Sequence, residues 1–117
     1  MIKRKEEINI RPVKGAQGGK GQVYFHDWLT KEEACDLGRV FSKLVIPPGS
    51  SIGVHQHIGE FEAIYVLEGQ ATVTDGDETV VLNPGDMNLC REGGFHGVEN
   101  CGDQDLVLMA LIMYTPK

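Results

Sequence analysis

Turn signals that recur at short intervals are the feature that most limits how this 117-residue chain can fold. From residue 47 onward, Pro-Gly, Asp-Gly, Asn-Pro-Gly and Gly-Gly groups separate short runs that are rich in β-branched and aromatic residues. Short strands with turns about every 8–12 residues are typical of β-sandwiches and β-barrels. Asp75-Gly76 accepts the positive φ of a tight hairpin turn, so a hairpin is expected there. The sequence therefore predicts an all-β barrel, with strands over residues 41–46, 61–67, 71–74, 79–82, 87–90, 97–99 and 106–114.

The first 40 residues follow this pattern less well and are expected to form an N-terminal arm, with the barrel over residues 41–117. Residues 22–26 suit a strand. Thr30 and Glu33 have the spacing of a capping box, which predicts one or two helical turns over residues 30–37. The glycine-rich residues 14–21 lack the ending of a phosphate-binding loop and are expected to form a mobile loop.

Composition excludes several classes of partner. The net charge of −6 argues against nucleic acid, because neutralising phosphates needs a basic face. No apolar run reaches the roughly 18 residues of a membrane helix, and no apolar segment resembles a signal peptide. Three cysteines are an odd number at unrelated spacings, which favours free thiols. We therefore expect a cytoplasmic protein that binds neither nucleic acid nor membrane.

Three of the four histidines fall in two short segments that carry the candidate site. His55 and His57 are two residues apart, so in an extended segment both rings lie on one face. Glu62 follows after Gly59, where the chain can turn and start a new strand that faces the same centre. His96 lies 34 residues after Glu62, and a barrel would return it to face the other three.

Three neutral imidazoles and one carboxylate form a mixed nitrogen and oxygen ligand set. Such a set suits Mn, Fe, Ni, Co, Cu or Zn, whereas Ca and Mg prefer oxygen ligands alone. Four protein ligands leave two positions of an octahedral ion open, which points toward chemistry or ligand binding rather than a structural role. A single histidine on a strand is more often a hydrogen-bonded core residue, so the prediction depends on the set.

Residues 49–69 resemble the first motif of the cupin superfamily. That motif has a glycine, five intervening residues, His-x-His, a glutamate and a closing glycine. All of its specified positions are filled here, by Gly49, His55, His57, Glu62 and Gly69.

Residues 85–100 resemble the second cupin motif, with Gly85, Gly93, His96 and Asn100 in place and Arg91 where the motif has proline. The resemblance covers about residues 41–115. It implies a double-stranded β-helix (jelly-roll) barrel in which His55, His57, Glu62 and His96 hold one divalent transition metal ion. We expect manganese, with Fe, Ni or Zn as alternatives.

Glu60 is the competing carboxylate, but its distance from His57 does not fit the motif, so a solvent-facing or rim position is expected for it. Arg91, Tyr65 and Phe61 are the candidate substrate-binding residues. Arg91 could fork onto a carboxylate substrate, or it could lie exposed and pair with a neighbouring glutamate. Phe61 and Tyr65 could line the pocket or pack in the core.

The resemblance is to small cupins of the oxalate decarboxylase-like type and implies a metalloenzyme that acts on a small carboxylate, such as oxalate or a 2-oxo acid. It is incomplete, because Ile52 stands where that enzyme has its catalytic arginine, and its proton-donating lid glutamate has no counterpart. The alternatives are a non-enzymatic metal-dependent binding module, an Fe-dependent dioxygenase and, more distantly, a sugar isomerase or epimerase. The N-terminal strand could pair with a neighbouring sheet, so we expect a homodimer.

Overall fold

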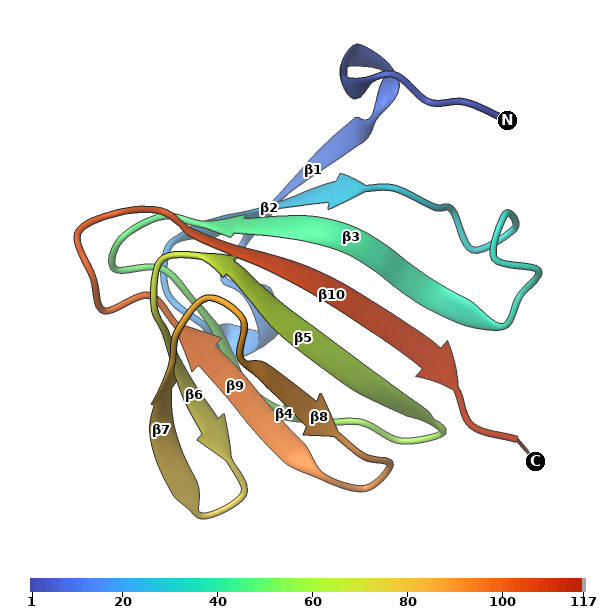
Figure 1. The fold of residues 1–117 in the computed structure, drawn as a ribbon. Helices are drawn as coiled ribbons and strands as arrows, with labels where there is room; N and C mark the ends of the chain where they lie inside the picture. Colours follow the sequence, from blue (N-terminus) through green and yellow to red (C-terminus); the bar gives the residue numbers. More distant parts are fainter. Residues whose placement is uncertain (117) are drawn as a thin grey trace.

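The structure is a computed structural model that describes residues 1–116, and these residues form ten strands in two antiparallel sheets (Figure 1). The larger sheet has the order β1-β2-β3-β10-β5-β8, and the smaller has the order β4-β9-β6-β7. The strands are β1 (Asn9–Lys14), β2 (Gln22–Asp27), β3 (Gly38–Ile46), β4 (Ser51–Gln56), β5 (Glu60–Glu68), β6 (Ala71–Asp75), β7 (Glu78–Leu82), β8 (Met87–Cys90), β9 (Phe95–Glu99) and β10 (Leu106–Tyr114).

The hydrophobic core lies between the two sheets. Buried residues alternate with more exposed ones along β3 and β10, as expected for strands that place every second side chain in a core. Leu44, Ile46, Val66 and Leu108 are almost completely buried there, together with Val73 and other residues of the smaller sheet. Each such aliphatic side chain contributes roughly 1.5–3 kcal/mol by leaving water, so the core holds the two sheets together.

The predicted all-β barrel is confirmed, and each expected strand is present within a few residues. The sequence pattern missed two strands, β1 and β4, because neither has the apolar run by which the others were found. The Asp75-Gly76 hairpin joins β6 and β7 as expected. No helix in the described part of the chain is long and apolar enough to cross a membrane.

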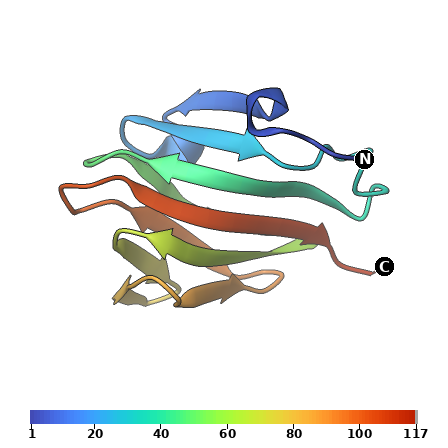
Figure 2. The same cartoon turned by 45° about the horizontal axis from the view of Figure 1, so that its top comes forward.

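The N-terminal strands are part of the larger sheet. β1 pairs with β2, and β2 pairs with β3; Figure 2 shows these strands side by side with β10 and β5. β3 begins at Gly38, so a boundary at residue 40 falls inside a strand. The first 40 residues thus extend the same sheet, and they bring the side chains of β1 beside the barrel interior.

Two connections differ from the sequence-based expectation. Residues 16–18 form a 3-10 turn, η2, that packs on β4; a Cβ at Gly19 would lie 2.3 Å from the Ser51 carbonyl oxygen, so glycine permits this contact. The segment predicted as a mobile loop is therefore seated against the barrel. Thr30 and Glu33 make both capping-box hydrogen bonds, but the chain continues only as turns, because Cys35 and Asp36 take left-handed φ values.

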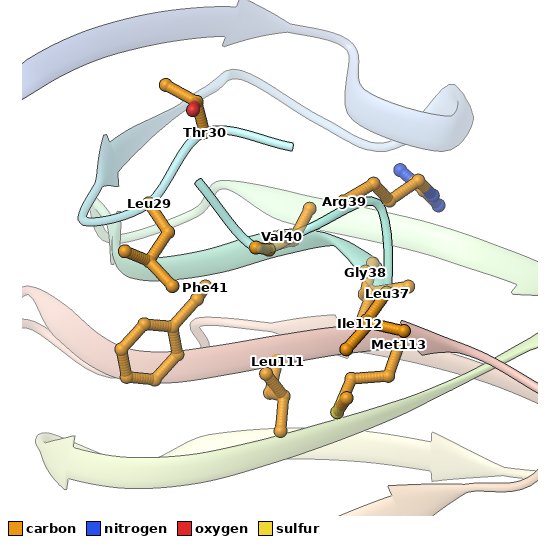
Figure 3. Close-up of a pocket in the computed structure, with 11 residues that line it drawn as sticks. Leu29, Thr30, Leu37, Gly38, Arg39, Val40, Phe41, Leu111, Ile112 and Met113 are labelled. Atoms are coloured by element: carbon orange, nitrogen blue, oxygen red, sulfur yellow. The ribbon is translucent and has the colours of Figure 1, made fainter. Parts of the chain in front are cut away.

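The outer face of the larger sheet is largely apolar, with Lys43 as a charged residue on it. We use this name for the side chains of β3, β5, β8 and β10 that point away from the core. Cross-strand pairing aligns them in rows, one of which runs Phe41–Leu111–Ala63–Leu89. A cavity of about 320 Å³ lies at one end of this face, between β3, β10 and the turn near residue 30 (Figure 3).

Asn100 joins the turn that follows β9 to the end of β3. Its side-chain amide donates hydrogen bonds to the carbonyl oxygens of Ile46 (2.8 Å) and Gln104 (2.7 Å), and its side-chain oxygen accepts one from the backbone of Gly102 (2.9 Å). The Asn100 side chain and Ile46 are buried, so the Ile46 carbonyl oxygen has no access to replacement water, whereas Gly102 and Gln104 are exposed.

We expect Asn100→Ala to lower the free energy of unfolding by about 1–3 kcal/mol, because it leaves the buried carbonyl group of Ile46 without its donor. Urea denaturation measures this change. Gln104→Ala is the matched control, because it keeps the backbone carbonyl oxygen that Asn100 binds and removes only an exposed side chain. Its effect on the free energy of unfolding should stay within about 0.5 kcal/mol. Equal effects of the two substitutions would contradict the role of the amide.

Candidate metal centre

The four predicted ligand residues come from three strands and one strand end. His55 on β4 and His96 on β9 are direct cross-strand neighbours. His57 immediately follows β4, where it still pairs with residues 93 and 94 through its backbone. Glu62 lies near the start of β5 and points into the barrel. The fold therefore brings together four residues that span 42 positions of the sequence.

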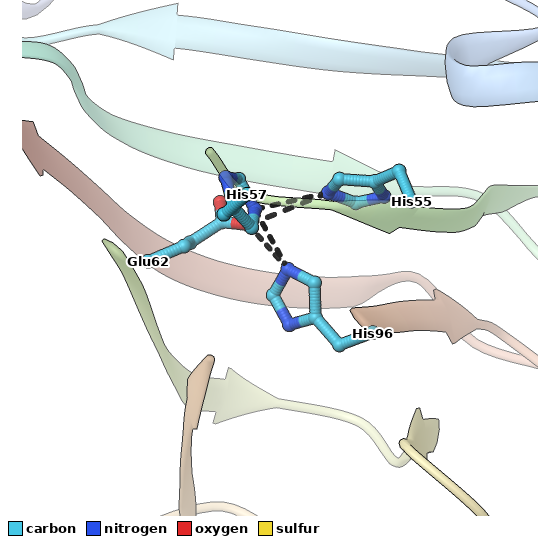
Figure 4. Close-up of side chains that lie close together, drawn as sticks. All are labelled: His55, His57, Glu62 and His96. Carbon is cyan, nitrogen blue, oxygen red and sulfur yellow. Dashed lines mark hydrogen bonds and ion pairs between the residues drawn. The ribbon is translucent and has the colours of Figure 1, made fainter. Parts of the chain in front are cut away.

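The side chains of these residues meet at one point (Figure 4). His57 Nε2 lies 3.1 Å from the Nε2 atoms of both His55 and His96. The Glu62 carboxylate oxygen Oε1 lies 2.7 Å from His96 Nε2 and 3.0 Å from His57 Nε2. His57, Glu62 and His96 are buried, and His55 is partly exposed, so the group opens toward solvent on the His55 side.

Each imidazole is oriented by an acceptor at its other nitrogen. Nδ1 of His55 lies 2.7 Å from the Gly53 carbonyl oxygen, Nδ1 of His57 lies 2.5 Å from Glu60 Oε2, and Nδ1 of His96 lies 2.8 Å from Asn88 Oδ1. A nitrogen that faces such an acceptor carries the proton, which leaves Nε2 with a free lone pair. The three lone pairs and the carboxylate oxygen therefore face one another.

This donor set fits a transition metal ion. Two ligand atoms at right angles and about 2.1 Å from one ion lie roughly 3.0 Å apart, which agrees with the separations of 2.7 to 3.1 Å. Lone pairs at this distance repel one another unless a cation lies between them. His55, His57, Glu62 and His96 would hold the ion, which would supply a Lewis-acidic centre for an anionic ligand.

The close approach of these side chains shifts the pKa values of His57 and Glu62. The hydrogen bond with Glu62 raises the pKa of His57, and burial opposes this shift only in part. Burial raises the pKa of Glu62, but the three imidazoles that face its carboxylate outweigh burial, so this pKa lies far below its usual range. A raised pKa favours the protonated ring of His57, and a metal ion would compete with that proton for Nε2.

Glu60 is not at a solvent-facing rim, so that expectation is wrong. It is 9% exposed and bonds His57 Nδ1 from beneath the ligand group. Its two oxygens also accept hydrogen bonds from Arg39 Nε (2.7 Å) and Nη2 (2.8 Å). The fork with Arg39 holds the pKa of Glu60 below its usual range against burial, so the carboxylate stays ionised and orients His57.

A cavity of about 180 Å³ adjoins the ligand group. Sites for drug-sized molecules usually measure about 300–1,000 Å³, so this cavity suits a ligand of only a few atoms. Its walls are mostly apolar, and the N-terminal strands supply part of them. The lining residues apart from the ligands come from β1, η2, β2, β3, β4 and β10, and include Arg11, Val13, Phe25, Arg39, Ile52 and Ile112.

The three predicted substrate-binding residues do not line this cavity. Phe61 and Tyr65 alternate with Glu62 along β5, so they point to the outer face of the sheet. Arg91 follows β8 and is exposed. The sequence pattern did not predict that Glu60 and Asn88 orient ligand histidines, or that Arg11 and Arg39 line the cavity. The alternation of side chains in β5 could have predicted the inward position of Glu60, since it places Glu60 and Glu62 on the same face.

Comparison with known proteins agrees with the fold and the ligand group. The family model described as the cupin domain matches residues 42–112. The chain belongs to the cupin family. The geometry above is thus that of a cupin whose three histidines and one glutamate could hold a metal ion.

Two of the matches come from Thermotoga maritima. This cupin is 37% identical to an oxalate-binding protein over 113 residues, which cover 97% of this chain and 93% of the relative. A crystal structure of a predicted oxalate decarboxylase superposes with a TM-score of 0.93 at 36% identity, covering 98% of this chain and all of the other. A polyketide cyclase from Streptomyces resistomycificus shares the fold, with a TM-score of 0.78 at 22% identity over 97% of this chain and 80% of that one.

We expect Asn88→Leu to lower metal affinity about 10–100-fold, because His96 then loses the acceptor that keeps Nε2 free and aimed at the ion. Competition with a fluorescent chelator measures the change. Gln70→Leu, an exposed position between β5 and β6, is the control and should leave the affinity unchanged. Full affinity in the Asn88 variant, with its fold intact by circular dichroism, would contradict this orienting role.

Proposed function

We propose that this cupin binds one divalent transition metal ion, manganese in our expectation, and uses it to bind a small carboxylate such as oxalate. The observation that carries the proposal is the convergence of three oriented Nε2 atoms and Glu62 beside a small cavity. Four protein ligands leave open positions on a six-coordinate ion. A carboxylate that enters the cavity would take these positions.

The charge of the site supports an anionic ligand only when the metal is present. The arginines of the cavity are neutralised by their partners, Arg11 by Asp27 and Arg39 by Glu60. With neutral imidazoles, Glu62 then leaves the site with one negative charge, and a divalent ion reverses the sign. Carboxylate binding should therefore depend on the metal. The name of the oxalate-binding relative agrees with a ligand of this class.

The cavity lining favours binding over decarboxylation. Apart from the metal ligands, the ionisable side chains among its lining residues are the two arginines. A guanidinium keeps its protons at all physiological pH values, so it cannot act as the general acid that protonates a carbanion after loss of CO₂. Of the hypotheses that the sequence left open, the metal-dependent binding module therefore agrees best with the site.

We expect oxalate to raise the melting temperature of the manganese-loaded protein and to have no effect on the metal-stripped protein. Thermal-shift assays and isothermal titration calorimetry test this. Wild-type protein loaded with Zn serves as a control for the ion, and assays for formate and CO₂ test for turnover. Equal binding of oxalate by the metal-stripped protein would contradict the proposal, and release of CO₂ would favour the enzyme.

We also propose that the protein is a homodimer joined through the outer face of the larger sheet. β10 is apolar along its whole length, which is typical of strands that are covered on both sides. Tyr65, Leu67, Met87 and Leu89 remain 38 to 52% exposed on this face. A second copy of a chain with net charge −6 can approach closely only through a face that carries little charge, and such a face is self-complementary.

Tyr65→Lys combined with Leu89→Lys should convert the dimer to a species of 12.9 kDa, because paired copies would bury four unpaired ammonium groups. Light scattering after size-exclusion chromatography measures the mass. Val81→Lys on β7, which is 55% exposed outside the outer face, is the control and should leave the dimer intact. A wild-type mass of one chain at micromolar concentration would contradict the proposal.

A further inference from the structure

Arg39 owes its direction to a β-bulge in β3. Along β10, Ile112 pairs with Val40 and the next residue, Met113, pairs with Gly38, so Arg39 has no partner on that strand. An unpaired extra residue bends the strand and changes the direction of its side chain, and bulges are frequent next to active sites. In a regular strand, Arg39 would point to the side opposite Val40.

The observed direction is the opposite of that expectation. Arg39 and Val40 extend to the same side of the sheet, whereas Phe41, Leu111 and Met113 extend to the other side (Figure 3). Gly38 permits the bulge, because a Cβ there would lie 2.5 Å from the Ile112 carbonyl oxygen. The bulge thus moves a guanidinium from the outer face to the cavity that adjoins the metal ligands.

Arg39 has donors to spare in this position. A guanidinium carries five N–H groups, and the fork on Glu60 uses one at Nε and one at Nη2. Three N–H groups therefore remain, and the side chain is 42% exposed at the mouth of the cavity. Because Glu60 holds one edge of the guanidinium, a ligand that meets the other edge finds a donor that is already in place.

Arg11, which lines the same cavity, is held by a carboxylate in the same way. Its Nε and Nη2 fork onto Asp27, and its guanidinium carbon lies 4.6 Å from the centre of the Phe25 ring. The hydrogen bond to Asp27 raises the pKa of Arg11, whereas burial and the charge of Arg39 lower it. Both guanidinium groups line the same cavity, so N–H groups of both are available to one ligand there.

We propose that Arg39 and Arg11 form an anion subsite beside the metal, which selects short dicarboxylates over monocarboxylates. The inference rests on the proposed function, since one carboxylate of the ligand binds the metal and the second meets the free guanidinium N–H groups. Charge-assisted hydrogen bonds of this kind are among the strongest that a site can offer. Arg91, which is exposed and does not line the cavity, has no part in it.

The test compares oxalate with acetate on manganese-loaded protein by isothermal titration calorimetry, with metal content measured in each sample. Arg39→Gln should weaken oxalate binding about 10–100-fold and change acetate binding by less than about threefold. Arg11→Gln should act in the same direction. Arg91→Gln is the matched control, because it removes the same charge from an exposed position, and it should leave both affinities unchanged.

Arg39→Gln leaves Glu60 without its cationic partner, so the double variant Arg39→Gln/Glu60→Gln separates ligand binding from that effect. Weak oxalate binding by the double variant at full metal occupancy supports the subsite. Wild-type affinity for oxalate in either Arg39 variant, or a loss that follows metal content alone, would overturn it. Failure of the wild-type protein to bind oxalate would instead reject the proposed function.

Discussion

The close approach of three imidazole Nε2 atoms and one carboxylate oxygen is the constraint on which the rest of the structure depends. The hydrogen bonds at Nδ1 leave each Nε2 with a lone pair, and His57 Nε2 lies 3.1 Å from the Nε2 atoms of His55 and His96 in a largely buried place. A cation at this point, such as a proton or a metal ion, would offset the repulsion between these groups. The barrel thus holds together groups that would otherwise repel one another.

Support for this arrangement comes from outside the ligand set and from departures from regular strand geometry. Glu60 and Asn88 hold two of the rings, and Arg39 in turn holds Glu60. The register of β4 shifts between Ile52 and His55, and both residues line the cavity despite their odd spacing. The register of β10 shifts opposite Arg39. Bulges at these two places direct side chains from two sheets to one cavity, which a regular ladder would not do.

Most strands could be predicted from the sequence, since alternation of apolar residues between turn signals is a local property. β4 was missed because its burial is uneven and two of its six residues, Gly53 and His55, serve the η2 contact and the metal site instead of the core. The helical turns expected over residues 30–37 failed for another reason. The capping box formed, but the following residues entered left-handed conformations that lead the chain into β3.

The amino-acid sequence by itself determined the family, the all-β fold and the four candidate ligands, because motif spacing and residue type are written along the chain. Only the tertiary structure decided what surrounds those ligands. Glu60 supports His57. Phe61 and Tyr65 face the opposite side of the sheet. The arginine that lines the cavity is Arg39 and not Arg91. The physical reason is that the facing of a side chain depends on strand register and bulges, which arise from pairing between distant segments.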